Sequence, residues 1–418
     1  MNEHDKLSRR RFMKSTALTA GAAAAATVLP NVAAEAADEI LVGGLHDLSG
    51  FLDFAGIPMN QIMLMAIEEI NANGGLLGKQ VKGVVYDPQT NMSLYSQYAT
   101  QLALKDKAAV VMGAITSASR ETIRPIFHRF KTLYFYNTLY EGGVCDRNEI
   151  TLGTTPAQTV AQLVPHTMKL WGKKVYTIAA DYNYGQITAA WVKRYVEQNG
   201  GEVVSTDFFP LDVTNFGPTI SKIQSAKPDM VMSVLVGSGH LGFYNQWSAA
   251  GMKNEIPMAS TTFGAGGSEI EIITPEVANG IITSYGYYPS IDTPANKEWV
   301  AKVKARYPND TPFLTELSAF TWEGMMMWAD AVREAGSLDR MKVIEVLESG
   351  KSYDFPSGKV SIDPKTHHAI RDVFVADLED KKFIIKETVS QVQPEDTQLV
   401  CNLIENPNSN KHFEISLE

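Results

Sequence analysis

The sequence predicts an α/β protein built from two parallel sheets, each covered by helices. Short apolar segments alternate with amphipathic segments of about 12–15 residues along most of the chain, the pattern of parallel strands joined by crossover helices. At ~100–200 residues per domain, the 418 residues have room for two such sheets of about four or five strands each. Apolar residues form 44% of the chain, so both halves can bury a core.

The first half shows the alternation clearly. Its first helix has an apolar face, because residues 59, 62, 63, 66, 67 and 70 are apolar and fall at three- and four-residue spacings. Asn73-Gly74-Gly75 ends that helix. We expect strands over residues 40–45, 81–86, 109–113 and 132–136, with helices over 58–71, over 93–105 and from near 119.

The second half repeats the pattern and then changes. We expect helices over residues 157–171, 185–199, 216–225 and 239–251, and strands over 175–180, 202–209, 230–236, 256–260 and 281–284. Two long helices, 294–306 and 314–335, come next, and residues 373–378 and 383–389 read as a hairpin. Ligands of parallel α/β folds bind at the carboxyl ends of the strands, so the loops there should carry the function.

Residues 1–36 have the features of an export signal. Residues 8–14 match a twin-arginine motif, and an alanine-rich run over 16–32 follows that is too short to span a membrane. Ala34-Glu35-Ala36 predicts cleavage near Ala37. We therefore expect a soluble, periplasmic protein delivered by the twin-arginine export machinery.

Charge and cysteine content exclude several classes of protein. The chain has 47 acidic and 37 basic residues and a net charge of −10, which argues against nucleic acid or an anionic membrane as partner. Cys145 and Cys401 are too few for a four-cysteine zinc site or an iron–sulfur cluster. An exported protein can hold a disulfide, and the sequence leaves open whether these two cysteines pair.

No complete catalytic set stands out in the loops. Residues 237–242 match G-x-G-x-x-G, but residues 256–263 lack the acidic residue that a dinucleotide site needs, so we interpret the motif as a tight strand-to-helix turn. His367-His368 are sequence neighbours that cannot share a face, and we interpret both as surface residues. Asp87 precedes a proline and is interpreted as a turn residue. The sequence thus indicates a binding protein without a cofactor rather than an enzyme.

Four loops at equivalent strand ends carry neutral hydroxyl groups and aromatic rings. For Ser117 and Ser119 the alternative interpretation is helix capping, and for the tyrosines it is packing between the halves. The coincidence of loops from both halves favours a pocket for a small, uncharged polar ligand. The loops span residues 116–120, 136–142, 181–185 and 260–263.

The segment Ile70-Asn71-Ala72-Asn73-Gly74-Gly75-Leu76-Leu77-Gly78-Lys79 resembles the helix–turn signature of type I periplasmic binding proteins. Further motifs resemble the subgroup that binds urea and short-chain amides, which includes receptors of ABC transporters and the amide sensor of an amidase operon. These motifs are Thr116-Ser117-x-Ser119-Arg120, Tyr136-x-Thr138-x-Tyr140-Glu141-Gly142, Asp181-Tyr182-x-Tyr184, Val236-Gly237-x-Gly239 and Ser290-Ile291-Asp292-Thr293-Pro294-Ala295.

The resemblance implies two Rossmann-like lobes joined by three crossovers, with the ligand held between them. It assigns residues 39–155 and 285–358 to an N-terminal lobe, and residues 156–284 and 359–418 to a C-terminal lobe. It also implies an ABC-type membrane permease as partner.

The same resemblance implies a set of substrate-binding residues. The hydroxyl groups of the first lobe would hydrogen-bond an amide and its tyrosine would wall the pocket. The tyrosines of the second lobe would close over the ligand, with the second-lobe threonine beside them. The residues are Ser117, Tyr136, Thr138, Tyr182, Tyr184 and Thr262.

Three alternatives stay open. A branched-chain amino acid would need a carboxylate facing its ammonium group, and Asp181 or Glu269 could supply one. A sensor subunit that passes ligand occupancy to a membrane kinase would have the same receptor sequence. An exported enzyme is the third alternative, although no cofactor motif supports it.

Overall fold

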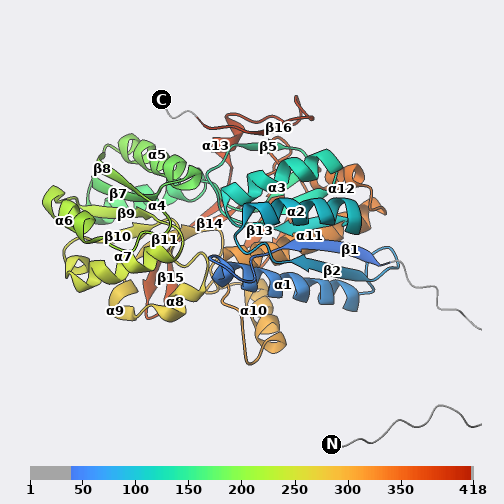
Figure 1. The fold of residues 1–418 in the computed structure, drawn as a ribbon, viewed down its shortest axis with the longest axis horizontal. Helices are drawn as coiled ribbons and strands as arrows, with labels where there is room; N and C mark the ends of the chain where they lie inside the picture. Colours follow the sequence, from blue (N-terminus) through green and yellow to red (C-terminus); the bar gives the residue numbers. More distant parts are fainter. Residues whose placement is uncertain (1–38, 416–418) are drawn as a thin grey trace, which may run out of the picture. The chain divides into compact units, whose positions relative to one another are not determined.

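The computed structural model describes residues 39–415, in which two large sheets each have helices packed against them (Figure 1). The first sheet is parallel throughout, in the order β2-β1-β3-β4-β6. β3 and β4 are buried along their whole length, as expected for central strands of a parallel sheet. The strands are β1 (Ile40–Leu45), β2 (Val81–Tyr86), β3 (Val110–Gly113), β4 (Leu133–Tyr136) and β6 (Glu149–Thr151).

The helices of the first half include α1 (Asp53–Ala72), α2 (Met92–Gln101) and α3 (Ser117–Phe130). A turn of π-helix, Leu102–Asp106, continues α2 over residues that we expected to be α-helical. α1 begins before the predicted residue 58, so Pro58 lies inside the helix. Its predicted apolar face is confirmed, since the following residues are buried: Met59, Ile62, Met63, Ala66, Ile67 and Ile70.

The second large sheet has the order β12-β13-β14-β11-β10-β9-β7-β8, and β15 pairs with β14. Its parallel strands are β7 (Lys174–Ala180), β8 (Glu202–Phe209), β9 (Met230–Val234), β10 (Met258–Ser260) and β11 (Ile282–Tyr285). Its antiparallel strands are β12 (Tyr353–Phe355), β13 (Gly358–Ile362), β14 (Ala369–Glu379) and β15 (Lys382–Val392). β14 and β15 confirm the predicted hairpin, whereas β12 and β13 were not predicted.

Six α-helices lie along the same part of the chain and alternate with the parallel strands. They are α4 (Val160–Trp171), α5 (Asn183–Gln198), α6 (Gly217–Ala226), α7 (Ser238–Ala249), α8 (Ser268–Ile272) and α9 (Pro275–Ala278), with a 3-10 turn at Met252–Asn254. The alternation predicted for this half is therefore confirmed.

The chain passes between the two sheets three times. It leaves the first sheet after β6, leaves the second after β11, and returns to the second through β12 and β13. Between the last two passages, α11 (Glu316–Ala335) packs against α1 and β3 of the first half, and α10 (Pro294–Arg306) and α12 (Arg340–Leu347) accompany it. Mostly parallel sheets joined in this way confirm the predicted fold class. The exact lobe bounds remain a prediction.

The C-terminal strap, residues 393–415, returns to the first half after β15 (Figure 1). It contains α13 (Glu395–Gln398) and β16 (Asn410–His412), and β16 pairs antiparallel with β5 (Val144–Asp146). Cys401 of the strap forms a disulfide with Cys145 of β5, which settles the pairing that the sequence left open.

The strap also contacts the first passage between the sheets. The buried Asp396 carboxylate accepts hydrogen bonds from Thr155 Oγ1 at 2.8 Å and from the Ala157 N–H at 2.9 Å. Burial raises the pKa of Asp396 to about 6, against these hydrogen bonds, which favour its charged form. The strap therefore holds both the first half and a segment that joins the halves.

The interpretation of His367 and His368 as surface residues is wrong, because both are fully buried. His367 Nε2 lies 2.8 Å from Glu348 Oε1, and His368 Nε2 contacts the Tyr140 hydroxyl. The two rings do point to different partners, but the protein covers both sides of this segment. Asp87, by contrast, accepts hydrogen bonds from the N–H groups of Leu48, Ser49 and Gln89, as a turn residue does.

The twin-arginine motif and the cleavage site lie outside the described residues. Within residues 39–415, no helix combines the length and the apolar composition that a membrane span requires.

Candidate ligand-binding site

A pocket of about 550 Å³, counting its part open to solvent, lies where the carboxyl ends of strands from both sheets meet. Segments that follow β1, β3 and β4 line it from the first half, with Leu317 of α11. Segments that follow β7, β9 and β10 line it from the second half. The pocket is therefore where ligands of parallel α/β folds bind, at the carboxyl ends of the strands.

Five of the six predicted site residues line this pocket, namely Ser117, Thr138, Tyr182, Tyr184 and Thr262. Tyr136 does not. Its side chain is fully buried and donates to the Ile115 carbonyl at 2.6 Å, with the Arg120 guanidinium 5.1 Å from the ring centre. Tyr136 therefore supports the loop that carries Ser117 and does not form the wall itself.

Three aliphatic hydroxyl groups of the pocket, those of Ser117, Thr138 and Thr262, donate their protons to the protein. Ser117 Oγ donates to Glu141 Oε2, and Thr138 Oγ1 donates to the Ala114 carbonyl at 3.2 Å. Thr262 Oγ1 donates to the Leu235 carbonyl at 2.5 Å. Each hydroxyl oxygen keeps lone pairs for a ligand but no free proton. The sequence suggested neutral donors here, whereas the structure shows groups placed to accept.

Two tyrosines of the second half add an aromatic wall. The rings of Tyr182 and Tyr184 lie 6.2 Å apart, and the Tyr184 hydroxyl donates to Thr261 Oγ1 at 3.1 Å. Burial raises the pKa of both phenols well above the ordinary value, so both are neutral.

Several helices begin at the pocket, among them α3, α5 and α7, and their first N–H groups can donate to a ligand. Thr116 caps α3 and accepts from the Ser119 N–H at 3.0 Å, while neither Tyr182 at α5 nor Gly237 at α7 caps its helix through a side chain. Gly237 has φ = 80°, and a Cβ there would lie 2.4 Å from the Phe51 ring. The G-x-G-x-x-G segment is thus a tight strand-to-helix turn, as interpreted.

The carboxylate of Glu269 was absent from the predicted set of site residues but lines the pocket. Its side chain is 3% exposed, and Oε1 accepts from the N–H groups of Gly264 at 2.9 Å and Gly266 at 3.3 Å. Oε2 is buried and has no hydrogen-bond partner. Burial raises the pKa of Glu269 to about 7, against the backbone hydrogen bonds, which lower it. The only sequence feature that hints at this buried carboxylate is the glycine-rich loop before it, whose N–H groups can reach the side chain.

The remaining titratable residue of the pocket is a histidine. His240 is 4% exposed, and burial lowers its pKa to about 4, so it is neutral. Among the described residues that line the pocket there is no lysine or arginine. Asp181, the other carboxylate considered from the sequence, is exposed and accepts from Gln186 Nε2 at 2.8 Å. Residues 39–415 hold no group of His, Cys, Asp or Glu side chains arranged to bind a metal ion.

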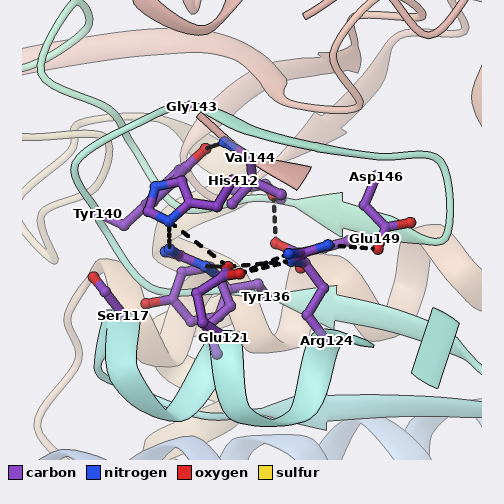
Figure 2. Close-up of polar contacts among 12 residues, drawn as sticks. Ser117, Glu121, Arg124, Tyr136, Tyr140, Gly143, Val144, Asp146, Glu149 and His412 are labelled. Carbon is purple, nitrogen blue, oxygen red and sulfur yellow. Dashed lines mark hydrogen bonds and ion pairs between the residues drawn. The ribbon is translucent and has the colours of Figure 1, made fainter. Parts of the chain in front are cut away.

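A buried ionic network lies behind the first-half wall (Figure 2). Glu141, which accepts from Ser117, pairs with Arg120 Nη2 at 3.1 Å, and neither side chain is exposed. Burial opposes the charge of Arg120, but Glu141 and nearby groups outweigh it and hold its pKa well above the ordinary value. The Arg120 guanidinium also lies 4.3 Å from the centre of the Tyr140 ring.

The network reaches the C-terminal strap. His412 Nε2 lies 3.3 Å from Glu141 Oε1, and Arg124 contacts Asn410. Arg124 Nη1 also lies 3.0 Å from Asp146 Oδ2 on β5 (Figure 2). A chain of direct contacts therefore links a pocket hydroxyl, Ser117, with the strap.

Comparisons with known proteins agree with this architecture. A relative from Brucella melitensis described as Leu/Ile/Val-binding protein homolog 6 is 25% identical over 389 residues, which cover 90% of this chain and 96% of the relative.

Two solved structures are also similar in fold. An amino acid ABC transporter substrate-binding protein from Pseudomonas fluorescens Pf-5 superposes with a TM-score of 0.79 and 20% identity, over 88% of this chain and all of that chain. A solute-binding protein of an ABC transporter from Rhodopseudomonas palustris BisB5, solved with 3,4-dihydroxybenzoic acid, gives 0.76 and 21%, over 85% and 99%.

A family model described as a periplasmic binding protein domain matches residues 40–398, from β1 into the C-terminal strap. The match covers both halves and the pocket between them. The chain belongs to this family of solute-binding receptors, and it has the type I periplasmic binding protein fold.

Proposed function

We propose that the protein is the substrate-binding component of an ABC importer and that it binds urea or a short-chain amide in the pocket. The observation that carries this proposal is the direction of the pocket's hydrogen bonds. Since Ser117, Thr138 and Thr262 donate to the protein, their oxygens accept from a ligand. Urea and primary amides are small, uncharged and rich in N–H groups.

The starts of the helices supply the complementary groups. The carbonyl oxygen of an amide needs donors, and the first N–H groups of α3 and α5 are available at the pocket. An aromatic carboxylate, such as the ligand of the Rhodopseudomonas neighbour, suits this pocket less well. Its charge would face Glu269 without a lysine or arginine in the described lining to balance it.

A branched-chain amino acid is the second candidate, and one observation favours it. The unpartnered oxygen of Glu269 could accept from an ammonium group, while a helix start could receive the ligand carboxylate. The Brucella relative is described as a homolog of a Leu/Ile/Val-binding protein, which associates that relative with branched-chain amino acids.

Titration calorimetry tests both candidates on the purified protein, with urea, formamide, acetamide, leucine and benzoate as ligands. The proposal expects heat from at least one amide or urea and none from benzoate. Binding of leucine alone would replace the first candidate by the second. A protein that binds none of the amides or urea would contradict the amide proposal.

A further inference from the structure

The C-terminal strap brings one imidazole ring, that of His412, to the carboxylate that accepts the Ser117 proton. His412 lies on β16, whose register places it opposite Val144 of β5. Its Nε2 atom lies 3.0 Å from the Gly142 carbonyl oxygen and 3.3 Å from Glu141 Oε1. The ring therefore reaches the buried ionic network behind the first-half wall from the side of the strap (Figure 2).

The loop opposite the strap is shaped for this close approach. Gly143 has φ = 92°, and a Cβ there would lie 2.1 Å from the Phe413 carbonyl oxygen. The Phe413 N–H donates to the Gly143 carbonyl at 2.8 Å, and the disulfide between Cys145 and Cys401 ties the strap to the strand that follows. Because any side chain at residue 143 would push the strap away, the glycine and the disulfide together fix the position of His412.

The neighbours of the His412 ring assign its tautomer. Nε2 faces the oxygens of Gly142 and Glu141 and therefore carries the proton, whereas Nδ1 lies 3.5 Å from Arg120 Nη2 and accepts from it. Burial lowers the pKa of His412, and the guanidinium lowers it further, so the ring is neutral. One neutral side chain of the strap thus contacts both members of the buried ion pair.

The place of the Glu141 carboxylate decides what Ser117 offers to the pocket. Glu141 Oε1 lies against Arg120 Nη2 at 3.1 Å and against His412, and Oε2 accepts the Ser117 proton. While the carboxylate holds this place, Ser117 Oγ presents only lone pairs to a ligand. A carboxylate that turned away would free the hydroxyl proton, which would then oppose a ligand N–H group.

We propose that His412 is a positioning residue, which holds the Glu141 carboxylate in place so that Ser117 accepts from the ligand. This inference rests on the proposed function, because it requires a ligand N–H group at Ser117. It gives the end of the chain a part in ligand affinity, in addition to its part in holding the first half. No residue of the strap touches the ligand in this role.

Two substitutions of His412 test the role on the full protein. His412→Phe removes both ring nitrogens and keeps an aromatic ring beside Tyr140, 6.4 Å away between ring centres. We expect the affinity for urea or acetamide, measured by calorimetry, to fall roughly two- to tenfold, the effect of one lost hydrogen bond. His412→Gln should bind nearly as tightly as the wild type, because its amide offers both an N–H group for Gly142 and an acceptor for Arg120.

Lys411→Met is the matched control. Lys411 precedes His412 on β16, so its side chain points to the opposite face of the strand, and it does not line the ligand pocket. Calorimetry should give this variant the affinity of the wild type. Thermal unfolding of every variant without ligand checks that each is folded.

Ser117→Ala separates positioning from a general loss of structure. In a protein without the Ser117 hydroxyl, His412→Phe should cause no further loss of affinity, because the group through which it acts is absent. Equal losses with and without the hydroxyl would overturn the role of His412 and leave the amide proposal standing. So would a His412→Phe protein that binds as tightly as the wild type, or a His412→Gln protein that binds as weakly as His412→Phe.

A wild type that binds leucine but neither urea nor acetamide overturns the amide proposal and leaves the role of His412 open to the same test. Leucine is then the probe, since its ammonium group also donates N–H bonds. The role of His412 stands if His412→Phe weakens leucine binding roughly two- to tenfold when Ser117 is present and has no effect in the Ser117→Ala protein. It falls if the two losses are equal.

Discussion

The two walls of the pocket differ in how the protein uses their polar groups. On the first-half wall, Ser117 donates to Glu141, which pairs with Arg120, and this network continues to the strap. On the second-half wall, Glu269 is held by backbone N–H groups and keeps a free oxygen. A network of charge-assisted hydrogen bonds fixes geometry even though Arg120 Nη1 within it is buried without a partner, whereas the unpartnered acceptor of the second wall lies at the pocket lining. We therefore expect the first wall to govern stability and the second to govern the choice of ligand.

The largest effect should come from breaking the ion pair behind the first wall. Arg120→Met leaves Glu141 buried without its partner and should lower the free energy of unfolding by about 3–5 kcal/mol. Denaturant unfolding measures the change. Lys302→Met is the control, because Lys302 pairs with Glu69 at the surface and its loss should change stability by at most about 1 kcal/mol. Equal effects of the two variants would contradict the comparison.

Reduction of the disulfide should have the next largest effect. Freeing Cys401 from Cys145 releases the strap from β5, and we expect the free energy of unfolding to fall by about 2–4 kcal/mol. Calorimetric unfolding with and without a phosphine reductant measures this. A double variant with both cysteines replaced by serine should start at the lower stability and show no response to the reductant. An unchanged transition in the reduced wild type would show that the strap holds without the bond.

The contribution of the second wall should appear as a dependence of ligand affinity on pH. The pKa of Glu269 is about 7 in the free protein, and a ligand N–H stabilises the ionised form, so binding lowers that pKa. The affinity for urea or acetamide should be constant above about pH 7 and fall roughly tenfold per pH unit well below it. Burial keeps five other titratable side chains of the surroundings neutral near pH 7: His240, Tyr182, Tyr184, Tyr244 and Tyr285. Burial also raises the pKa of Glu316, the neighbour of the pocket residue Leu317, to about 7, so this carboxyl titrates in the same range.

Calorimetry between about pH 5 and 8 checks this prediction, which follows from the value of about 7 for Glu269. The Glu269→Gln variant is the control, because it removes the carboxyl of Glu269 and should leave only the weaker pH dependence that comes from Glu316. A wild-type affinity that rises on acidification would mean that the protonated carboxyl donates to the ligand.

The smallest effect should come from a single hydroxyl of the first wall. Thr138→Val preserves the shape of the side chain but removes the oxygen that donates to the Ala114 carbonyl and that we propose accepts from a ligand. We expect a loss of affinity of about 0.5–1.5 kcal/mol, roughly two- to tenfold. Unfolding of the variant without ligand separates a loss of stability from a loss of binding. An effect larger than that of Glu269→Gln would reverse the assignment of the two walls.

Most of the fold could be predicted because the spacing of apolar residues within a single helix or strand identifies that element. The apolar face of α1 and the alternation from β7 to β11 can be recognised in windows of one element. Four of the missed strands, β5, β6, β12 and β16, have three residues each, which is too short for a period to show, and β13, with five residues, was missed as well. β5 and β16 exist because they pair with each other across a long separation in sequence.

The site was predictable in position but not in polarity. Ser117, Thr138, Tyr182, Tyr184 and Thr262, chosen from loops at strand ends, line one pocket, and their contact with a ligand stays a prediction. Which way each hydroxyl donates depends on carbonyl and carboxylate groups from other loops, such as Glu141 for Ser117. The free oxygen of Glu269 likewise appears only when the backbone around it is in place. The position of a pocket residue can be predicted from its place in the chain, but the direction of its hydrogen bonds depends on neighbours from other loops.

The strap is synthesised long after the strand that it pairs with, so the first half cannot complete its fold early in translation. Cys401 follows Cys145 by 256 residues, so at ~5–20 residues per second the ribosome delivers the partner strand roughly 10–50 s after β5 has emerged. During that interval β5 has neither β16 beside it nor a partner for its thiol. The first half of the protein is thus completed only when the strap has been synthesised. A nascent chain that stops before Cys401 would leave β5 without its partner strand and Cys145 without its disulfide.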